Sequence, residues 1–354
     1  MEKFEIKKFG ECDINDPFFD SLKNDYPSFV NWYNNHLDRD VYVNQNADGI
    51  RALLILKDNE QDEIKLKDNL LPQKPRIKIC TLKLNENVRS QRLGEGSIGI
   101  ALWHWQKRPE DEIYVTVFPK QAQLIALLLK FGFKDIGEFE NGEHLFMKSK
   151  KDLDKSTPYT MFPYLDLSSE KFGILPVEAI YHDSLFPYSE LKNGEMFESD
   201  MAVSNGISKI FIATPYTSTS YKENEPVFVY RIFNGPNKRY KSVITSFCTI
   251  TKIHNIRLNN RYLKTKEEYL NIIKNKSVYE QKELDEIYAN KSNIIIIEMV
   301  YNGYFGKGNN INWKYLKENG YWNDGHPYQV ILSKEQFINL LKVGVDNEKD
   351  IIIN

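Results

Sequence analysis

Residues 77–105 read IKICTLKLNENVRSQRLGEGSIGIALWHW, and this stretch decides the fold of the N-terminal half of the chain. Apolar side chains recur through Ile77–Leu84 and predict a strand, a polar loop spans Asn85–Arg92, and an apolar run from Leu93 predicts a helix. A loop that leads into a helix N-terminus presents unpaired amides, and the helix dipole favours negative charge there. The stretch therefore predicts an anion site, which could hold a nucleotide, a pyrophosphate or nothing.

Four residues of the loop and of the first helical turn suit such a site. Arg89 and Arg92 add positive charge, and Gly94 and Gly96 let a ligand come close to the backbone. The run LKLNENVRSQRLGE also resembles the acyl-CoA-binding motif of the GNAT-type N-acetyltransferases, in which Arg/Gln-x-x-Gly-x-Gly/Ala opens a helix after an apolar strand end.

The motif fits this resemblance in two registers. In the first, Arg89 to Gly94 is the signature, and Arg92 stands where the family usually has its first glycine. In the second, Gln91-x-x-Gly94-x-Gly96 keeps both glycines but lengthens the loop by two residues. We prefer the first register because its loop length fits, and both remain open.

The resemblance implies an N-acyltransferase that uses acetyl-CoA and a primary amine acceptor. Leu82 and Leu84 would pair with the pantetheine arm through backbone groups, and the loop would cradle the pyrophosphate. The implied cofactor-binding residues are Leu82, Leu84, Arg89, Ser90, Gln91, Arg92, Leu93, Gly94 and Glu95.

The catalytic residues stay unassigned. Many enzymes of this family carry a tyrosine near the CoA sulfur, four residues before the glycine of a Gly-Phe turn, and here that position is Leu128, ahead of Gly132. Tyr114 and His104 are candidates for the missing acid, and Glu60 could help to deprotonate the amine. A solvated charge at Glu60 and a satisfied histidine at His104 are the plainer interpretations.

The order of the expected elements extends the resemblance to about residues 1–150. Asp16 and Pro17 suit the start of a helix, and Gly132 suits the end of another. Further strands are expected at 40–44, 52–57, 112–118 and 138–148, and a further helix at 121–130.

Composition and charge set the broad class. The 354 residues predict two domains, and the net charge of −2 divides into −8 for residues 1–200 and +6 for residues 201–354. The basic second half permits a nucleic-acid partner without requiring one. Three scattered cysteines predict no zinc site and a reducing compartment, and no stretch is apolar enough for a membrane span. We therefore expect a cytoplasmic protein without a bound metal, and the oligomeric state is not predicted.

Residues 151–200 are expected to link the two domains. The run KSKKDLDKST is polar, but the segment that follows it is aromatic and too apolar for a free linker. It should pack against both domains or begin the second one, which we place at residues 201–354.

The second domain is expected to be a small β-barrel with peripheral helices. Strands rich in β-branched and aromatic residues are expected at 208–213, 226–234, 241–251 and 293–300. Helices are expected at 266–274, 280–289 and 333–341, the last with Ser333 and Gln336 forming a capping box.

This domain resembles the PUA superfamily, in particular its ASCH/EVE-like branch. The resemblance lies in Glu225–Tyr230, Tyr240–Ile250 and Gly325–Ser333, without a clear Gly-x-Lys-x-x-Glu-x-Arg signature. The expected fold class is thus α/β (α+β): a GNAT-like mixed sheet flanked by helices, followed by a PUA-like barrel. The resemblance implies binding of RNA or modified DNA bases.

Two segments could contact a nucleic acid. ATPYTSTSY at 213–221 offers hydroxyl groups, and NGPNKRYK at 234–241 offers positive charge beside an aromatic ring. Both could equally be solvent loops. The candidate nucleic-acid-binding residues are Tyr216, Ser218, Tyr221, Arg231, Lys238, Arg239 and Lys241. The alternative to an active enzyme is an acyl-CoA-binding scaffold that mainly binds RNA through this domain.

Overall fold

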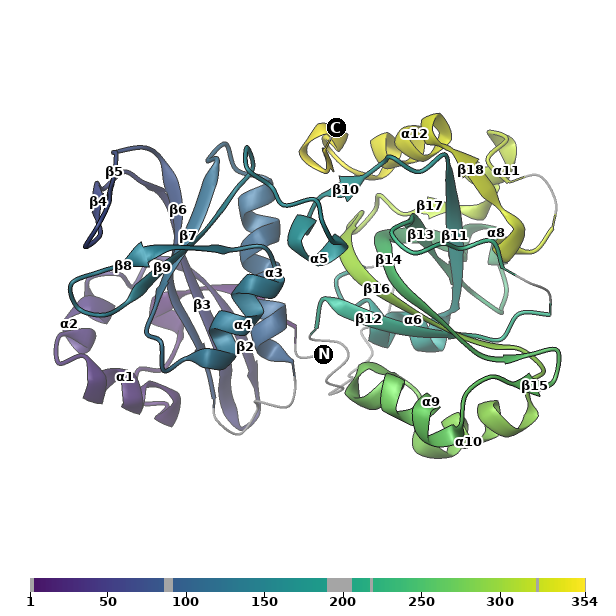
Figure 1. The fold of residues 1–354 in the computed structure, drawn as a ribbon, viewed down its shortest axis with the longest axis horizontal. Coiled ribbons are helices and arrows are strands. Elements are labelled where there is room, and N and C mark those ends of the chain that lie inside the picture. Colours follow the sequence, from purple (N-terminus) through teal and green to yellow (C-terminus); the bar gives the residue numbers. More distant parts are fainter. Residues whose placement is uncertain (1–2, 86–91, 190–205, 217–218, 323–324, 354) are drawn as a thin grey trace. The chain divides into compact units, whose positions relative to one another are not determined.

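The computed structural model describes residues 3–85, 92–189, 206–216, 219–322 and 325–353. The chain divides into two compact units, residues 2–154 and residues 155–354 with Met1 (Figure 1). We call them the N-terminal and C-terminal units and describe each by itself.

In the described part of the N-terminal unit, seven strands form one sheet in the order β1-β2-β3-β6-β7-β9-β8. Among these strands, only β6 and β7 run parallel. The strands are β1 (Glu5–Lys8), β2 (Asp40–Asn46), β3 (Gly49–Glu60), β6 (Arg76–Leu84), β7 (Glu112–Val117), β8 (Lys134–Glu138) and β9 (His144–Ser149), and β4 (Ile64–Lys65) pairs with β5 (Leu70–Leu71) apart from the sheet.

Helices cover both faces of this sheet. Because neighbouring residues of a strand point to opposite faces, Val41 and Val43 face the cluster around α1 (Asp20–Asp25) and α2 (Phe29–Asn34), whereas Tyr42 faces α3 (Leu93–Gln106). A 3₁₀ turn (Pro17–Phe19) precedes α1, and Asp16 accepts a hydrogen bond from its amides, as the sequence predicts.

Helix α4 (Ala122–Lys130) packs beside α3. Gly132 follows α4 with φ of 78°, and the amide of Phe133 returns to the carbonyl of Leu128 at 3.0 Å. The prediction that Gly132 ends this helix is confirmed, since a left-handed residue at this place lets the chain reverse.

The C-terminal unit is built on a second sheet with the order β12-β16-β14-β13-β11-β18. Its strands are β11 (Lys171–Glu178), β12 (Ser208–Ala213), β13 (Pro226–Ile232), β14 (Val243–Leu258), β16 (Ile294–Tyr304) and β18 (Ile331–Ser333), with β15 (Arg261–Tyr262) and β17 (Ile311–Asn312) paired to β14, and β10 (Leu165–Asp166) paired to β19 (Ile352–Ile353). Its helices are α5 (Pro158–Met161), α6 (Ala179–Leu185), α8 (Lys238–Lys241), α9 (Lys266–Ile273), α10 (Gln281–Asn290), α11 (Trp313–Glu318) and α12 (Lys334–Gly344).

The mixed α/β class is confirmed in both units, but the expected small barrel is not closed. Among the described strands β12 and β18 end the sheet, and no pair joins them. The long strand β14 instead bends at several register shifts against β16, as bulges do. Helix α12 begins with the predicted capping box, in which Ser333 and Gln336 bind each other's amides.

From Lys155 to Ser189, the last residue described before a gap, the segment between the two predicted domains belongs to the C-terminal unit, whereas residues 151–154 belong to the N-terminal unit. It contributes β11, which lies in the sheet between β13 and β18. Of the two possibilities left open by the sequence, the described part of the segment forms the beginning of the second unit.

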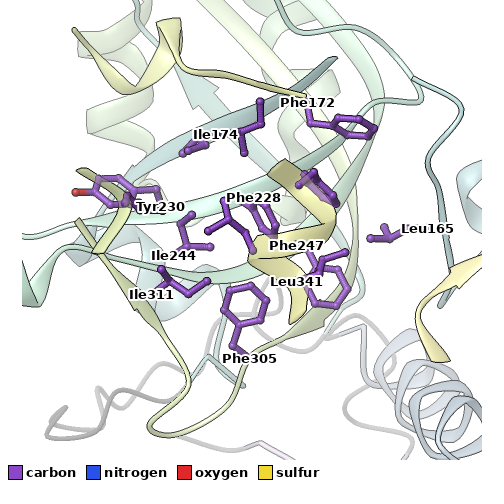
Figure 2. Close-up of a cluster of buried hydrophobic side chains, with 14 of the residues drawn as sticks. Leu165, Phe172, Ile174, Phe228, Tyr230, Ile244, Phe247, Phe305, Ile311 and Leu341 are labelled. Atoms are coloured by element: carbon purple, nitrogen blue, oxygen red, sulfur yellow. The ribbon is translucent and has the colours of Figure 1, made fainter. Parts of the chain in front are cut away.

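Two apolar clusters support this sheet. In the first, Phe228 stacks on Phe337 of α12 with ring centroids 4.2 Å apart, and Phe172 stacks on the same ring at 4.7 Å. Figure 2 shows Phe172 and Phe228 with other members of this cluster. The second cluster joins β12, β14 and β16 to α9 and α10.

Candidate functional site

Strands β6 and β7 lie side by side for only part of their length. Their pairing runs from Arg76 opposite Glu112 to Ile79 opposite Val115. Beyond this point β6 continues to Leu84 and pairs with β3, while β7 pairs with β9. Within the described residues, the edge of β6 that faces β7 therefore pairs with no strand after Ile79. Such a main-chain edge can bind an extended ligand as an added strand would.

The side chains at the end of β6 differ from those at its start. Ile77 and Ile79 are buried, whereas Leu82 and Leu84 are half-buried. Helix α3 begins close by, because a Cβ added at Gly94 would lie 3.3 Å from Cδ1 of Leu84. The unpaired edge of β6 and the N-terminus of α3 are thus adjacent.

Arg92 begins α3 in an unusual backbone conformation. Its φ of 58° and ψ of 18° lie in the left-handed region, which glycine adopts most easily. This conformation favours the first register of the motif, in which Arg92 stands at a glycine position of the resembled family.

A buried ion cluster surrounds the first turn of α3. The guanidinium of Arg92 donates to one oxygen of Glu95 from Nη2 at 2.6 Å and from Nε at 3.2 Å. Lys130 of α4 lies 3.5 Å from the other oxygen. Glu95 is 8% exposed, and its position in the first turn also places its charge near the positive end of the helix dipole.

The predicted cofactor-binding residues fall into three groups. Leu82 and Leu84 lie at the unpaired end of β6, and Arg92, Leu93, Gly94 and Glu95 lie at the start of α3. Arg89, Ser90 and Gln91 lie outside the described residues.

Two of the three catalytic candidates share the sheet face opposite α3. Glu60 pairs with Arg76 and Tyr114 with Lys78, so both side chains point to the α1–α2 side. Burial raises the pKa of Tyr114, and the charge of Glu60 raises it further, which keeps the phenol neutral. Burial alone would raise the pKa of Glu60, but the hydrogen bonds from Lys57 and Asp62 outweigh it and lower the pKa.

The third candidate, His104, lies on the α3 side and is engaged there. Its Nδ1 is 2.9 Å from the hydroxyl of Tyr42, and its Nε2 is 2.7 Å from Asp58. His104 and Tyr114 therefore lie on opposite sides of the sheet. The position of the family's tyrosine, Leu128, is fully buried in the core and offers no acid.

The predicted nucleic-acid-binding residues divide into exposed and buried ones. Tyr216 is 99% exposed, and Ser218 lies outside the described residues. Tyr221 and Arg231 are buried and bind partners inside the protein: the Tyr221 hydroxyl donates to the carbonyl of Ile174 at 2.7 Å, and Arg231 binds Asp183. The prediction that Tyr221 and Arg231 contact a nucleic acid is therefore corrected: neither presents a side chain to a ligand in this structure.

The remaining three candidates, Lys238, Arg239 and Lys241, are exposed on α8. Helix α11 adds two further lysines to this basic area. The ammonium of Lys314 lies 5.6 Å from the ring of Tyr240, which is 56% exposed. We call this area the two-helix basic surface; its members are Lys238, Arg239, Tyr240, Lys241, Lys314 and Lys317. The sequence analysis did not identify the two lysines of α11 as candidates. Their spacing of three residues on a short helix is the one sequence signal that places them on the same face.

The buried Arg231 belongs to a polar relay in the C-terminal unit. Its Nε and Nη2 donate to the two oxygens of Asp183, each at 2.7 Å. Nδ1 of His182 lies 2.8 Å from Asp183, and Nε2 lies 2.8 Å from the hydroxyl of Thr245, at a register shift between β13 and β14. The hydroxyls of Ser246, Ser189 and Tyr301 continue the relay.

The pKa shifts inside this relay determine which of its groups carry protons. Burial alone would raise the pKa of Asp183, but hydrogen bonds from Arg231 and His182 hold it at about 2. Burial lowers the pKa of His182, despite the opposing effect of Asp183. At neutral pH, His182 is therefore uncharged, donates from Nδ1 to the carboxylate and accepts from Thr245.

In the described part of the chain, the His, Cys, Asp and Glu side chains form no group of three that could hold a metal ion. No helix in this part of the chain is long and apolar enough to cross a membrane.

No protein-family model and no curated protein matches the chain. Solved structures of two kinds resemble it. The ASCH protein of Zymomonas mobilis, solved as a point variant, is 10% identical over 49% of this chain and 96% of its own, with a TM-score of 0.33.

Structures of the second kind are acetyltransferases or their relatives. NAA60 of Arabidopsis thaliana, solved with a bisubstrate analogue, is 11% identical over 42% of this chain and 98% of its own, with a TM-score of 0.31. A GNAT-family acetyltransferase of Streptococcus agalactiae is 12% identical over 42% of this chain and 95% of its own, also with a TM-score of 0.31. The chain thus resembles both GNAT acetyltransferases and ASCH proteins, each over about half of its length, and both resemblances predicted from the sequence are found.

Proposed function

We propose that the N-terminal unit is an acetyl-CoA-dependent N-acetyltransferase that acts on a primary amine. The observation that carries the proposal is the separation of β6 from β7 after Ile79 and Val115, next to the start of α3. An unpaired main-chain edge suits the amide-containing pantetheine arm, and a helix N-terminus suits phosphates. The half-buried Leu82 and Leu84 suit the apolar parts of an extended ligand.

The residues of the chain can supply the remaining chemistry. Bound acetyl-CoA supplies an acetyl group activated as a thioester. Main-chain amides at the open edge of β6 can stabilise the oxyanion that develops when the amine attacks. Glu60, kept ionised near neutral pH by Lys57, can accept a proton from the amine through water. Leu128 offers no acid for the sulfur, so positioning carries most of the rate enhancement.

Calorimetric titration of acetyl-CoA into the full chain tests the binding step. We expect a micromolar dissociation constant for the wild type and loss of binding in Arg89→Glu, because a carboxylate would repel the pyrophosphate. Lys107→Glu is the matched control, since Lys107 is exposed at the opposite end of α3 and should leave the affinity unchanged. A wild type that binds no acetyl-CoA would falsify the acyltransferase proposal.

Release of the CoA thiol separates an active enzyme from a scaffold. With a panel of primary amines present, the enzyme should release thiol above the rate of spontaneous hydrolysis, and Glu60→Gln should lower the rate about 10²-fold without weakening acetyl-CoA binding. Binding without amine-dependent release would instead support the alternative, an acyl-CoA-binding scaffold.

We further propose that the C-terminal unit recruits RNA or another nucleic acid through the two-helix basic surface. Its five cations include Lys314, which has one acidic neighbour, Glu318, at 3.6 Å. The exposed ring of Tyr240 among these cations suits base stacking. The test is to titrate a labelled single-stranded RNA with the full chain and to follow its fluorescence anisotropy. An unchanged anisotropy would contradict this second proposal.

A further inference from the structure

The start of α3 already holds an anion of its own. One oxygen of Glu95 accepts from Arg92 at 2.6 and 3.2 Å, and the other lies 3.5 Å from Lys130. The Glu95 and Arg92 side chains are 10% and 9% exposed, so solvent screens this pair weakly. Lys130 is more open, at 39%. Two cations at the helix start are thus engaged by one internal carboxylate.

The placement of this carboxylate matters because of the helix itself. The first turn of an α-helix is the position where a negative charge gains most from the helix dipole. Glu95 uses that position, although it is three residues beyond the Arg92 cap and its side chain is turned into the protein. Any phosphate that binds at the same helix end meets cations that are already partly neutralised.

We propose that Glu95 sets the affinity of the α3 N-terminus for phosphate groups by competing with them for Arg92 and Lys130. The inference rests on the proposed function, because it concerns the same site. In the ligand-free state Glu95 holds both cations. A bound pyrophosphate interacts fully with Arg92 and Lys130 only when their ion pairs with Glu95 weaken. The carboxylate therefore lowers the affinity for CoA.

The competing explanation is that Glu95 orients Arg92 for the ligand. The two explanations predict opposite signs for the same substitution. If Glu95 competes, its neutral isostere binds phosphate more tightly. If Glu95 orients, the isostere binds more weakly, because a released arginine must be ordered again on binding.

The experiment is a calorimetric titration of CoA, without the acetyl group, and of inorganic pyrophosphate into wild type, E95Q, E95D and K130M. Competition predicts about five- to tenfold tighter binding of both probes in E95Q, from the loss of one anion beside a helix start. K130M, which removes a cation from the same cluster, should bind both probes more weakly. E95D keeps the charge and should stay within about twofold of the wild type.

Each outcome decides the matter. Tighter binding in E95Q together with weaker binding in K130M supports the competition. An E95Q affinity equal to or below that of a wild type that binds CoA overturns it and leaves the acyltransferase proposal standing. A wild type and an E95Q that both fail to bind CoA overturn the proposed function itself. Thermal unfolding shows whether each variant is folded, and E95A, which also removes the carboxylate, replaces E95Q if E95Q does not fold.

Discussion

Replacing Arg231 with methionine is expected to cost about 3–5 kcal/mol of the free energy of unfolding of the C-terminal unit. The guanidinium binds both oxygens of Asp183 at 2.7 Å, and both side chains are largely shielded from water. Methionine fills a similar volume but leaves the carboxylate buried without its cation. The measurement is urea unfolding followed by a probe in the C-terminal unit, since two units need not unfold together.

Two controls make this result specific. Arg239→Met removes an exposed arginine of α8 and should change the free energy of unfolding by less than about 0.5 kcal/mol. Adding Asp183→Asn to the Arg231 variant removes the orphaned charge and should restore a large part of the loss. A loss below about 1 kcal/mol in Arg231→Met would show that water reaches Asp183.

The same pair predicts an acid limit. The pKa of Asp183 is held at about 2 in the folded chain, below its ordinary value near 3.8. A carboxyl group whose pKa is lowered by folding stabilises the folded state at pH values above its pKa in the unfolded chain. The contribution of Asp183, about 2 kcal/mol, is therefore lost as the pH falls from about 4 to 2. Burial lowers the pKa of His182, so its contribution is lost as the pH falls below about 6.5. In Arg231→Met, the loss of stability between about pH 4 and pH 2 that Asp183 causes should disappear.

Reversing three charges of α8 in K238E/R239E/K241E is expected to weaken single-stranded RNA binding by at least about 10²-fold. Each substitution removes one phosphate contact and adds repulsion, and the slope of log affinity against log salt should fall by about 2, at roughly 0.7 per contact for single strands. The measurement is fluorescence anisotropy at several salt concentrations. K314E/K317E tests the half of the surface that α11 supplies and should weaken binding in the same direction.

The matched control reverses the same number of charges elsewhere on the C-terminal unit. K266E/K282E/K291E changes three exposed lysines of α9, α10 and the residue after α10. It should leave the affinity within about threefold of the wild type. Equal losses in the two triple variants would mean that net charge, and no particular surface, attracts the RNA.

The strands and helices that the sequence predicted best carry strong local signals. Strand β12 has the predicted bounds, Ser208–Ala213, and α12 has its predicted cap because Ser333 and Gln336 bind each other locally. Strand β11 was not predicted, because Gly173 and Pro176 argue against a strand within a sheet. The structure accommodates Pro176 since β18 pairs only with Lys171–Gly173 and ends before it.

The candidate site was predictable only where it is contiguous in sequence. The motif places Gly94 and Arg92 at the helix start, as the structure has them. The face on which a side chain lies depends on strand register, and register decides that His104 and Tyr114 are separated. The pairing of Arg231 with Asp183 joins β13 to α6 across many residues, and no local pattern distinguishes such an arginine from an exposed one.

The contact at Gly94 brings the start of a helix close to the end of a strand. Because a Cβ there would lie only 3.3 Å from Leu84 and 3.6 Å from Leu127, the two elements meet through close packing. We therefore expect the last residues of β6 and the first turn of α3 to open and close as one cooperative unit. Amide hydrogen exchange should report it, with the two segments losing protection together in Gly94→Val.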